Sequence, residues 1–212
     1  MATTGLPLSA EKVRRYGGTV MLTLANRITL FRIFLVPLFV MVACYYGQSV
    51  DRGEPKEWMR YTALAIFLIA SLSDGIDGFI ARKFNQVSRL GIILDPIADK
   101  GLLLAALITL AVANWEYELP IWFVVLVIAR DVVVVVGSAL LHMINGSVQI
   151  KPSVPGKIAT MFQMIAISWT MLQLPHHHWP IFAAGAFVLV SGIGYILDGL
   201  RQLSHPPAAS TS

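Results

Sequence analysis

Six apolar segments divide this chain of 212 residues, and each is close to the length that a helix needs to cross a bilayer. They lie at residues 28–46, 60–81, 95–113, 119–143, 157–174 and 179–200. Only 13% of the residues are charged and the mean hydropathy is +0.69, which argues against an ordinary soluble domain. The sequence therefore predicts an all-α integral membrane protein with six transmembrane helices.

Basic residues fall unequally on the two sides that this threading creates. Of the 16 basic residues, all except Arg52, Lys56 and Arg60 lie on the side of the two termini. Because Lys and Arg concentrate in cytoplasmic loops, we expect both termini in the cytoplasm. The expected divisions are a cytoplasmic leader at 1–25, which could form an interfacial helix, a membrane domain at 26–202 and a disordered tail at 203–212.

Four carboxylates stand close to lipid depth, where acidic side chains are costly and call for a functional reason. Asp74 and Asp77 are three residues apart, and Asp95 and Asp99 are four apart, so each pair shares one face of a helix. The threading brings both pairs to the cytoplasmic end of one helical hairpin, which predicts a polar active site there. Mutual repulsion would need cations, and an all-oxygen donor set indicates a pair of Mg²⁺ or Mn²⁺ ions, with Ca²⁺ as an alternative.

Small residues and an arginine accompany these carboxylates. Gly78 and Gly91 lack side chains where a substrate could approach the backbone, and Ala81 widens the same groove. Arg82 could pair with a phosphate through two parallel hydrogen bonds. Together they indicate a site for a phosphoanhydride on metal ions, with a carboxylate available to deprotonate an attacking hydroxyl.

The complete pattern resembles the signature of the CDP-alcohol phosphotransferase family. It reads Asp74-x2-Asp77-Gly78-x2-Ala81-Arg82-x8-Gly91-x3-Asp95-x3-Asp99. An upstream segment, Asn26 to Arg32, is similar to the start of the family's first span, although Ala25 stands where proline is common. The resemblance covers residues 24 to 200 and implies transfer of a phosphatidyl group from CDP-diacylglycerol to an alcohol, with release of CMP.

The resemblance also implies a role for each signature residue. The metal ligands would be Asp74, Asp77, Asp95 and Asp99. Of these, Asp99 would also be the general base. The CDP moiety would be bound by Asp74, Gly78, Ala81, Arg82 and Gly91. Two Mg²⁺ or Mn²⁺ ions would polarise the diphosphate and stabilise the leaving CMP.

The acceptor alcohol is less strongly constrained. The signature region is similar to bacterial phosphatidylglycerophosphate synthases, which use glycerol 3-phosphate, and to CMP-forming cardiolipin synthases, which use phosphatidylglycerol. We expect glycerol 3-phosphate, with phosphatidylglycerol or another alcohol as the alternative; Asp131 after Arg130 resembles the cardiolipin synthases. A pocket for the acceptor phosphate could be formed by Arg130, Lys151, Lys157 and Arg201.

The same residues argue against other functions and bear on the partners of the chain. A transporter would spread its acids through the membrane depth, whereas these cluster at one face, which favours an enzyme. The sequence has no basic stripe with interleaved aromatic residues, so no nucleic-acid partner is expected. The expected setting is a bacterial-type inner or plasma membrane and its lipids, with a homodimer. Gly192 and Gly194 are expected to form a small-residue helix contact, either in the dimer or within the bundle. His176, His177 and His178 are expected in an interfacial loop.

Overall fold

The computed structural model describes residues 24–84, 89–145 and 154–204; the side chains of 24–28, 74–84 and 89–99, and a few toward later helix ends, lie outside the described part. The described ranges contain six helices in the predicted order and no strand. The helices are α2 (Leu24–Asp51), α3 (Glu57–Phe84), α4 (Arg89–Val112), α5 (Ile121–Asn145), α6 (Val154–Met171) and α7 (His178–Ser204).

Several helices run beyond the apolar segments that predict them. α2 continues to Asp51 rather than ending near residue 46, and α4 begins at Arg89 rather than near residue 95. Hydropathy marks only the apolar part of a helix, whereas backbone hydrogen bonding continues into polar residues at its ends. Past α2 the chain turns at Gly53, whose φ of 71° is readily adopted by glycine.

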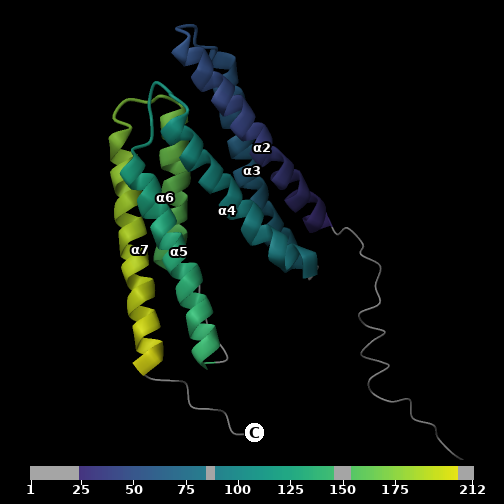
Figure 1. Ribbon diagram of the computed structural model, residues 1–212. Helices are drawn as coiled ribbons and strands as arrows, with labels where there is room; N and C mark the ends of the chain where they lie inside the picture. Colours follow the sequence, from purple (N-terminus) through teal and green to yellow (C-terminus); the bar gives the residue numbers. More distant parts are fainter. Residues whose placement is uncertain (1–23, 85–88, 146–153, 205–212) are drawn as a thin grey trace, which may run out of the picture.

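The six helices form two halves of three (Figure 1). α2 packs against both α3 and α4 to form the N-terminal half, and α7 packs against both α5 and α6 to form the C-terminal half. Between the halves, α4 makes narrower contacts with α5 and α6, and α3 touches α6. We call the end where α3 stops and α4 starts the signature end, and the opposite end, with the loops at 52–56, 113–120 and 172–177, the loop end.

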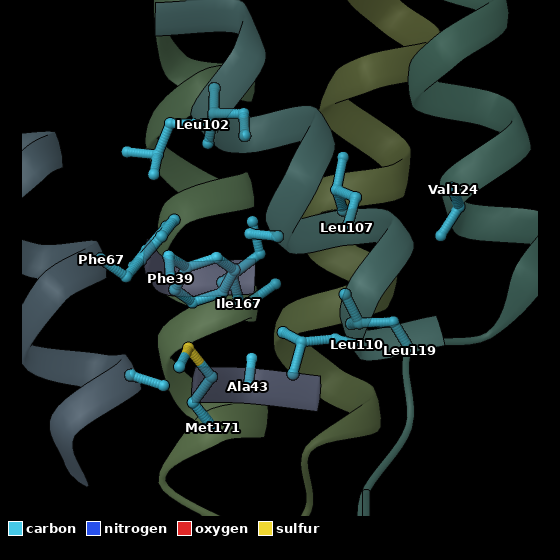
Figure 2. Packing of buried hydrophobic residues seen from close by; sticks show 14 of the residues in the cluster. Phe39, Ala43, Phe67, Leu102, Leu107, Leu110, Leu119, Val124, Ile167 and Met171 are labelled. Atoms are coloured by element: carbon cyan, nitrogen blue, oxygen red, sulfur yellow. The ribbon is translucent and has the colours of Figure 1, made fainter. Parts of the chain in front are cut away.

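The apolar core lies along α4 and joins both halves (Figure 2). Phe39 of α2 and Phe67 of α3 are fully buried, with ring centroids 6.0 Å apart. Leu107 of α4 and Ile167 of α6 belong to the same buried cluster. Because lipid tails are as apolar as these side chains, close packing rather than exclusion of water would hold such helices together in a bilayer.

The end of α4 approaches α2 so closely that one position requires glycine. A Cβ added at Gly47 would lie 1.6 Å from the backbone oxygen of Ala113, which no side chain could accommodate. Nearby, Trp115 Nε1 donates a hydrogen bond to the Ala43 carbonyl at 3.2 Å. The Tyr46 and Trp115 rings pack edge to face, with centroids 4.5 Å apart. These contacts set how α4 leaves the loop end.

A polar network also joins the two halves at the loop end. Arg60 of α3 donates to the side-chain oxygen of Gln173, which follows α6, and to the Tyr61 hydroxyl at 3.1 Å. The same guanidinium pairs with Glu57 at 2.5 Å. Gln173 in turn donates to the Tyr46 hydroxyl of α2 at 3.0 Å. The network therefore connects α2, α3 and the end of α6.

The outer surface of the bundle is rich in large apolar side chains. Phe34 of α2 is 67% exposed and Trp179 of α7 is 74% exposed, which suits contact with lipid. Two described segments are long and apolar enough to cross a bilayer, Thr29–Asp51 with mean hydropathy 1.9 and His178–Leu200 with 2.0. Six helices are therefore confirmed, while six membrane crossings stay a prediction.

Candidate active site

The signature residues occupy the adjoining ends of α3 and α4. The last turns of α3 contain Asp74, Asp77, Gly78, Ala81 and Arg82. The first turns of α4 contain Gly91, Asp95 and Asp99. Both stretches are helical, as the spacing argument requires. Their side chains lie outside the described residues, so the convergence of the carboxylates, the metal ligation and the contacts to CDP stay predictions.

Among the side chains that the structure describes, no three His, Cys, Asp or Glu residues form a group that could hold a metal ion. The consecutive histidines are instead part of a loop contact. The His177 ring stacks on Tyr117 with centroids 4.5 Å apart and an interplanar angle of 16°. Burial lowers the pKa of His177, and the neighbouring His178 lowers that pKa further. His176 and His177 lie in the loop before α7, as predicted, whereas His178, also expected in that loop, is the first residue of α7.

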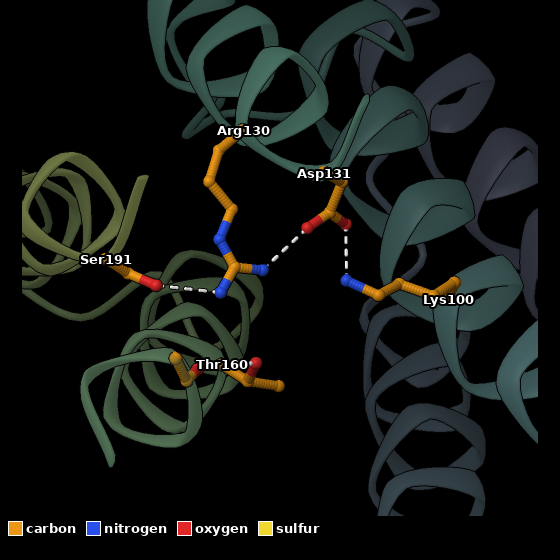
Figure 3. Close-up of polar contacts among 6 residues, drawn as sticks. Lys100, Arg130, Asp131, Thr160 and Ser191 are labelled. Carbon is orange, nitrogen blue, oxygen red and sulfur yellow. Dashed lines mark hydrogen bonds and ion pairs between the residues drawn. The ribbon is translucent and has the colours of Figure 1, made fainter. Parts of the chain in front are cut away.

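A charged cluster directly follows the signature in the described part of α4 (Figure 3). Lys100, the residue after Asp99, places its Nζ 2.6 Å from Oδ2 of Asp131 on α5. The other oxygen of that carboxylate, Oδ1, accepts a hydrogen bond from Nη1 of Arg130 at 2.8 Å. Nη2 of Arg130 donates to Ser191 Oγ of α7 at 2.8 Å. One continuous chain of polar contacts therefore joins α4, α5 and α7.

The packing of α5 against α7 determines where Arg130 lies. Its side chain is only 9% exposed and reaches α7 beside Ser191. The guanidinium also lies over the ring of Tyr195, one helical turn further, at 5.3 Å from the centroid. A Cβ added at Gly192 would lie 3.4 Å from Cγ of Arg130, an ordinary van der Waals distance, so this position of α7 faces the arginine stem. Gly192 is therefore in contact with a helix of its own chain.

The charges of this cluster do not cancel. Lys100 and Arg130 share the single carboxylate of Asp131, which leaves one net positive charge on the three side chains. Arg130 has five N–H donors, and the hydrogen bonds described above involve only Nη1 and Nη2. Its Nε is buried without a hydrogen-bond partner in that part of the chain. A nine-tenths buried guanidinium with unused donors and excess positive charge is suited to binding an anion.

The four cations predicted to bind the acceptor are only partly within the described part of the chain. Arg130 lies in the charged cluster described above, where its guanidinium is suited to binding an anion. Lys157 is exposed in the first turns of α6. Lys151 lies outside the described residues, and Arg201 is in α7 with its side chain outside them. The structure therefore positions Arg130 and leaves the assembly of the four cations as a prediction.

Two further polar side chains are buried near the signature end of α2. Arg32 is 1% exposed, and Thr29, one helical turn earlier, is fully buried. Both belong to the upstream segment that the sequence singles out. Because α2 packs on α3 and α4, these side chains belong to the interior of the N-terminal half rather than to its lipid-facing surface.

The partners of Arg130 on α7 were not found by sequence reasoning. Ser191 and Tyr195 are four residues apart, so they share one face of α7. That polar pair within the apolar middle of α7 was the available signal. The pairing of Lys100 with Asp131 depends on the crossing of α4 and α5, which local sequence patterns do not specify.

Comparison with known proteins identifies relatives over most of the chain. A family model described as CDP-alcohol phosphatidyltransferase matches residues 22–197. A Bacillus subtilis (strain 168) protein named CDP-diacylglycerol--glycerol-3-phosphate 3-phosphatidyltransferase is 36% identical over 195 residues, covering 86% of this chain and 98% of the relative. An Escherichia coli (strain K12) protein of the same name is 33% identical over 179 residues, covering 84% of this chain and 91% of the relative.

Proposed function

This chain belongs to the CDP-alcohol phosphatidyltransferase family, and we propose that it transfers the phosphatidyl group of CDP-diacylglycerol to glycerol 3-phosphate. The products would be phosphatidylglycerophosphate and CMP. Membership of the family makes the chain a phospholipid-synthesising enzyme rather than a transporter. The choice of acceptor is supported by the names of the relatives, which cover most of this chain.

The donor site of the proposal lies at the adjoining ends of α3 and α4. Asp74, Asp77, Asp95 and Asp99 provide an all-oxygen donor set, which fits Mg²⁺ or Mn²⁺ better than zinc. Two such ions, when bound, would neutralise the diphosphate and stabilise the leaving CMP. The CDP moiety would be bound by Asp74, Gly78, Ala81, Arg82 and Gly91.

The proposed chemistry is one displacement at the lipid-linked phosphorus. Asp99 accepts the proton of the acceptor hydroxyl, and the acceptor oxygen forms a bond to that phosphorus. The bond from the phosphorus to the bridging oxygen of CMP breaks, and CMP leaves with that oxygen. No covalent enzyme intermediate is required, so the protein acts by positioning and by electrostatic stabilisation.

The proposed acceptor site is supported by the cluster of Lys100, Asp131 and Arg130. It holds one net positive charge and directly follows Asp99 in α4. An acceptor that carries a phosphate would bring a complementary negative charge close to the proposed base. We propose that Arg130 binds this phosphate, assisted by Lys151, Lys157 and Arg201.

The proposed setting is a bacterial-type plasma membrane crossed six times, with both termini and the active site on the cytoplasmic side. Residues 1–25 would form the leader and 203–212 the tail. A homodimer is also proposed. Gly194 has open space around its α-carbon and could contact a second copy, whereas Gly192 is already packed against Arg130.

The experiment that tests the function is a CMP-release assay on the purified full-length protein in detergent micelles. CDP-diacylglycerol and Mg²⁺ are supplied with glycerol 3-phosphate, phosphatidylglycerol, inositol phosphate or serine in parallel reactions. The proposal expects turnover with glycerol 3-phosphate and its loss in EDTA. Turnover with phosphatidylglycerol alone would instead identify a CMP-forming cardiolipin synthase.

A further inference from the structure

We infer that Asp131 is a positioning residue of the acceptor site, which holds Arg130 in place and anchors α5 to α4 through Lys100. The inference rests on the proposed function, because Arg130 is the residue assigned to the acceptor phosphate. The carboxylate of Asp131 would itself repel that phosphate. Its contribution to acceptor binding must therefore come through Lys100 and Arg130, which it holds in place.

The geometry divides the carboxylate between two helices. Oδ1 of Asp131 accepts from Arg130 on its own helix at 2.8 Å, and Oδ2 lies 2.6 Å from Lys100 Nζ on α4. These helices belong to different halves of the bundle and make only narrow contact with each other. The pair between Lys100 and Asp131 is therefore a specific link between the halves, beside the residue proposed as the base.

The opposite side of the guanidinium is held by α7. Ser191 accepts from Nη2 at 2.8 Å and the Tyr195 ring lies below the same group at 5.3 Å. Asp131 and Ser191 thus bind the two terminal nitrogens from different helices (Figure 3). A planar group held at both ends has a fixed orientation, so the direction of its remaining donors is fixed as well.

The burial of the three side chains indicates what loss of the carboxylate would do. Lys100 is 49% exposed and Asp131 27% exposed, whereas Arg130 is 9% exposed. Without the negative charge, Lys100 can turn toward solvent, but Arg130 cannot easily leave its site. The arginine would keep Ser191 and lose its second anchor, so its orientation rather than its presence would change.

The test compares two substitutions of Asp131 with one control substitution in the ion pair of Glu57 and Arg60 at the loop end. Asp131→Asn removes the charge at nearly constant shape, and Asp131→Glu restores it on a longer side chain. The control is Glu57→Gln, which breaks the 2.5 Å ion pair with the similarly buried Arg60. For each full-length variant, kcat, the KM for each substrate and the melting temperature are measured in the same detergent.

We expect Asp131→Asn to raise the KM for the acceptor about 10-fold while the KM for CDP-diacylglycerol changes by less than about twofold. Asp131→Glu should recover at least half of that effect on a logarithmic scale. Glu57→Gln should leave both KM values unchanged. An unchanged acceptor KM in Asp131→Asn, or an equal rise in both KM values together with a lower melting temperature, would overturn the inference.

The same assays separate this inference from the proposed function. The parallel reactions of the wild type with different acceptors decide the function. The KM for the acceptor that is turned over is then compared between Asp131→Asn and the wild type. A second readout needs no turnover: inorganic phosphate should raise the melting temperature of the wild type and of Glu57→Gln more than that of Asp131→Asn. An equal rise in all three proteins would contradict a positioning role.

Discussion

Two buried arginines, Arg60 at the loop end and Arg130 near the middle of α5, show how the same side chain can serve stability or recognition. Arg60 at the loop end is 10% exposed and Arg130 is 9% exposed, and each pairs with a carboxylate on its own helix. Each also has an Nε without a hydrogen-bond partner among the described residues, so that feature does not distinguish them. The difference lies in what else surrounds the two guanidinium groups.

Arg60 is balanced by its neighbours. Glu57 cancels its charge, and Gln173 and Tyr61 accept from the same guanidinium. Arg130 must share Asp131 with Lys100, so its cluster keeps an excess positive charge. Burying an uncompensated charge is costly, which makes such a residue a candidate for function when it persists inside a helical bundle. The two clusters therefore predict different consequences of mutation.

The largest expected effect comes from the signature itself. Asp99→Asn removes the group proposed to accept the proton of the acceptor hydroxyl, and should lower kcat about 10³-fold. The melting temperature should stay close to that of the wild type. CMP release under saturating substrates is the measurement, and near-normal turnover would exclude Asp99 as the general base.

The second largest effect is expected at Arg130. Arg130→Gln removes the excess charge at the proposed acceptor site and should raise the KM for glycerol 3-phosphate about 100-fold, because charge-assisted bidentate contacts are strong. Steady-state kinetics with each substrate varied in turn provide the measurement. If the KM for the acceptor is unchanged, Arg130 is a structural residue like Arg60.

The third prediction concerns the loop end. Gln173→Asn keeps a residue type that tolerates the positive φ of 55° at this position, but its amide is too short to join Arg60 to Tyr46. The loss of these hydrogen bonds should reduce the free energy of unfolding by about 1–3 kcal/mol, while both KM values stay unchanged. Thermal unfolding in detergent measures the first quantity. A selective change in the acceptor KM would show that the loop end also serves substrate binding.

The smallest effect is a pH dependence of stability at the loop end. The pKa of His177 is lowered in the folded protein, chiefly by burial and also by His178, so the fold favours the neutral ring. Its contribution is present above the unfolded pKa of about 6.5 and is lost as the pH falls through the lower folded pKa. The melting temperature of His177→Gln should therefore fall less than that of the wild type on acidification below about pH 6.5. Equal slopes for the two proteins would assign the pH dependence to other groups.

Much of the architecture followed from local properties of the chain. The six helices occur in the predicted order because each apolar segment is long enough to favour a helix on its own. The signature spacing likewise indicated a family that comparison with known proteins confirms. The helix ends were less accurate, since helices such as α2 and α4 continue into polar residues where hydropathy gives no signal.

Tertiary structure alone decided which charges meet. Arg130 next to Asp131 is visible in the sequence as a neighbouring pair of opposite charges. Only the crossing of α4 and α5 brings Lys100 to the second oxygen of the carboxylate, and only the packing of α7 supplies Ser191. A helix specifies its own faces through local spacing, but the partner of each face depends on side-chain packing summed over the whole bundle.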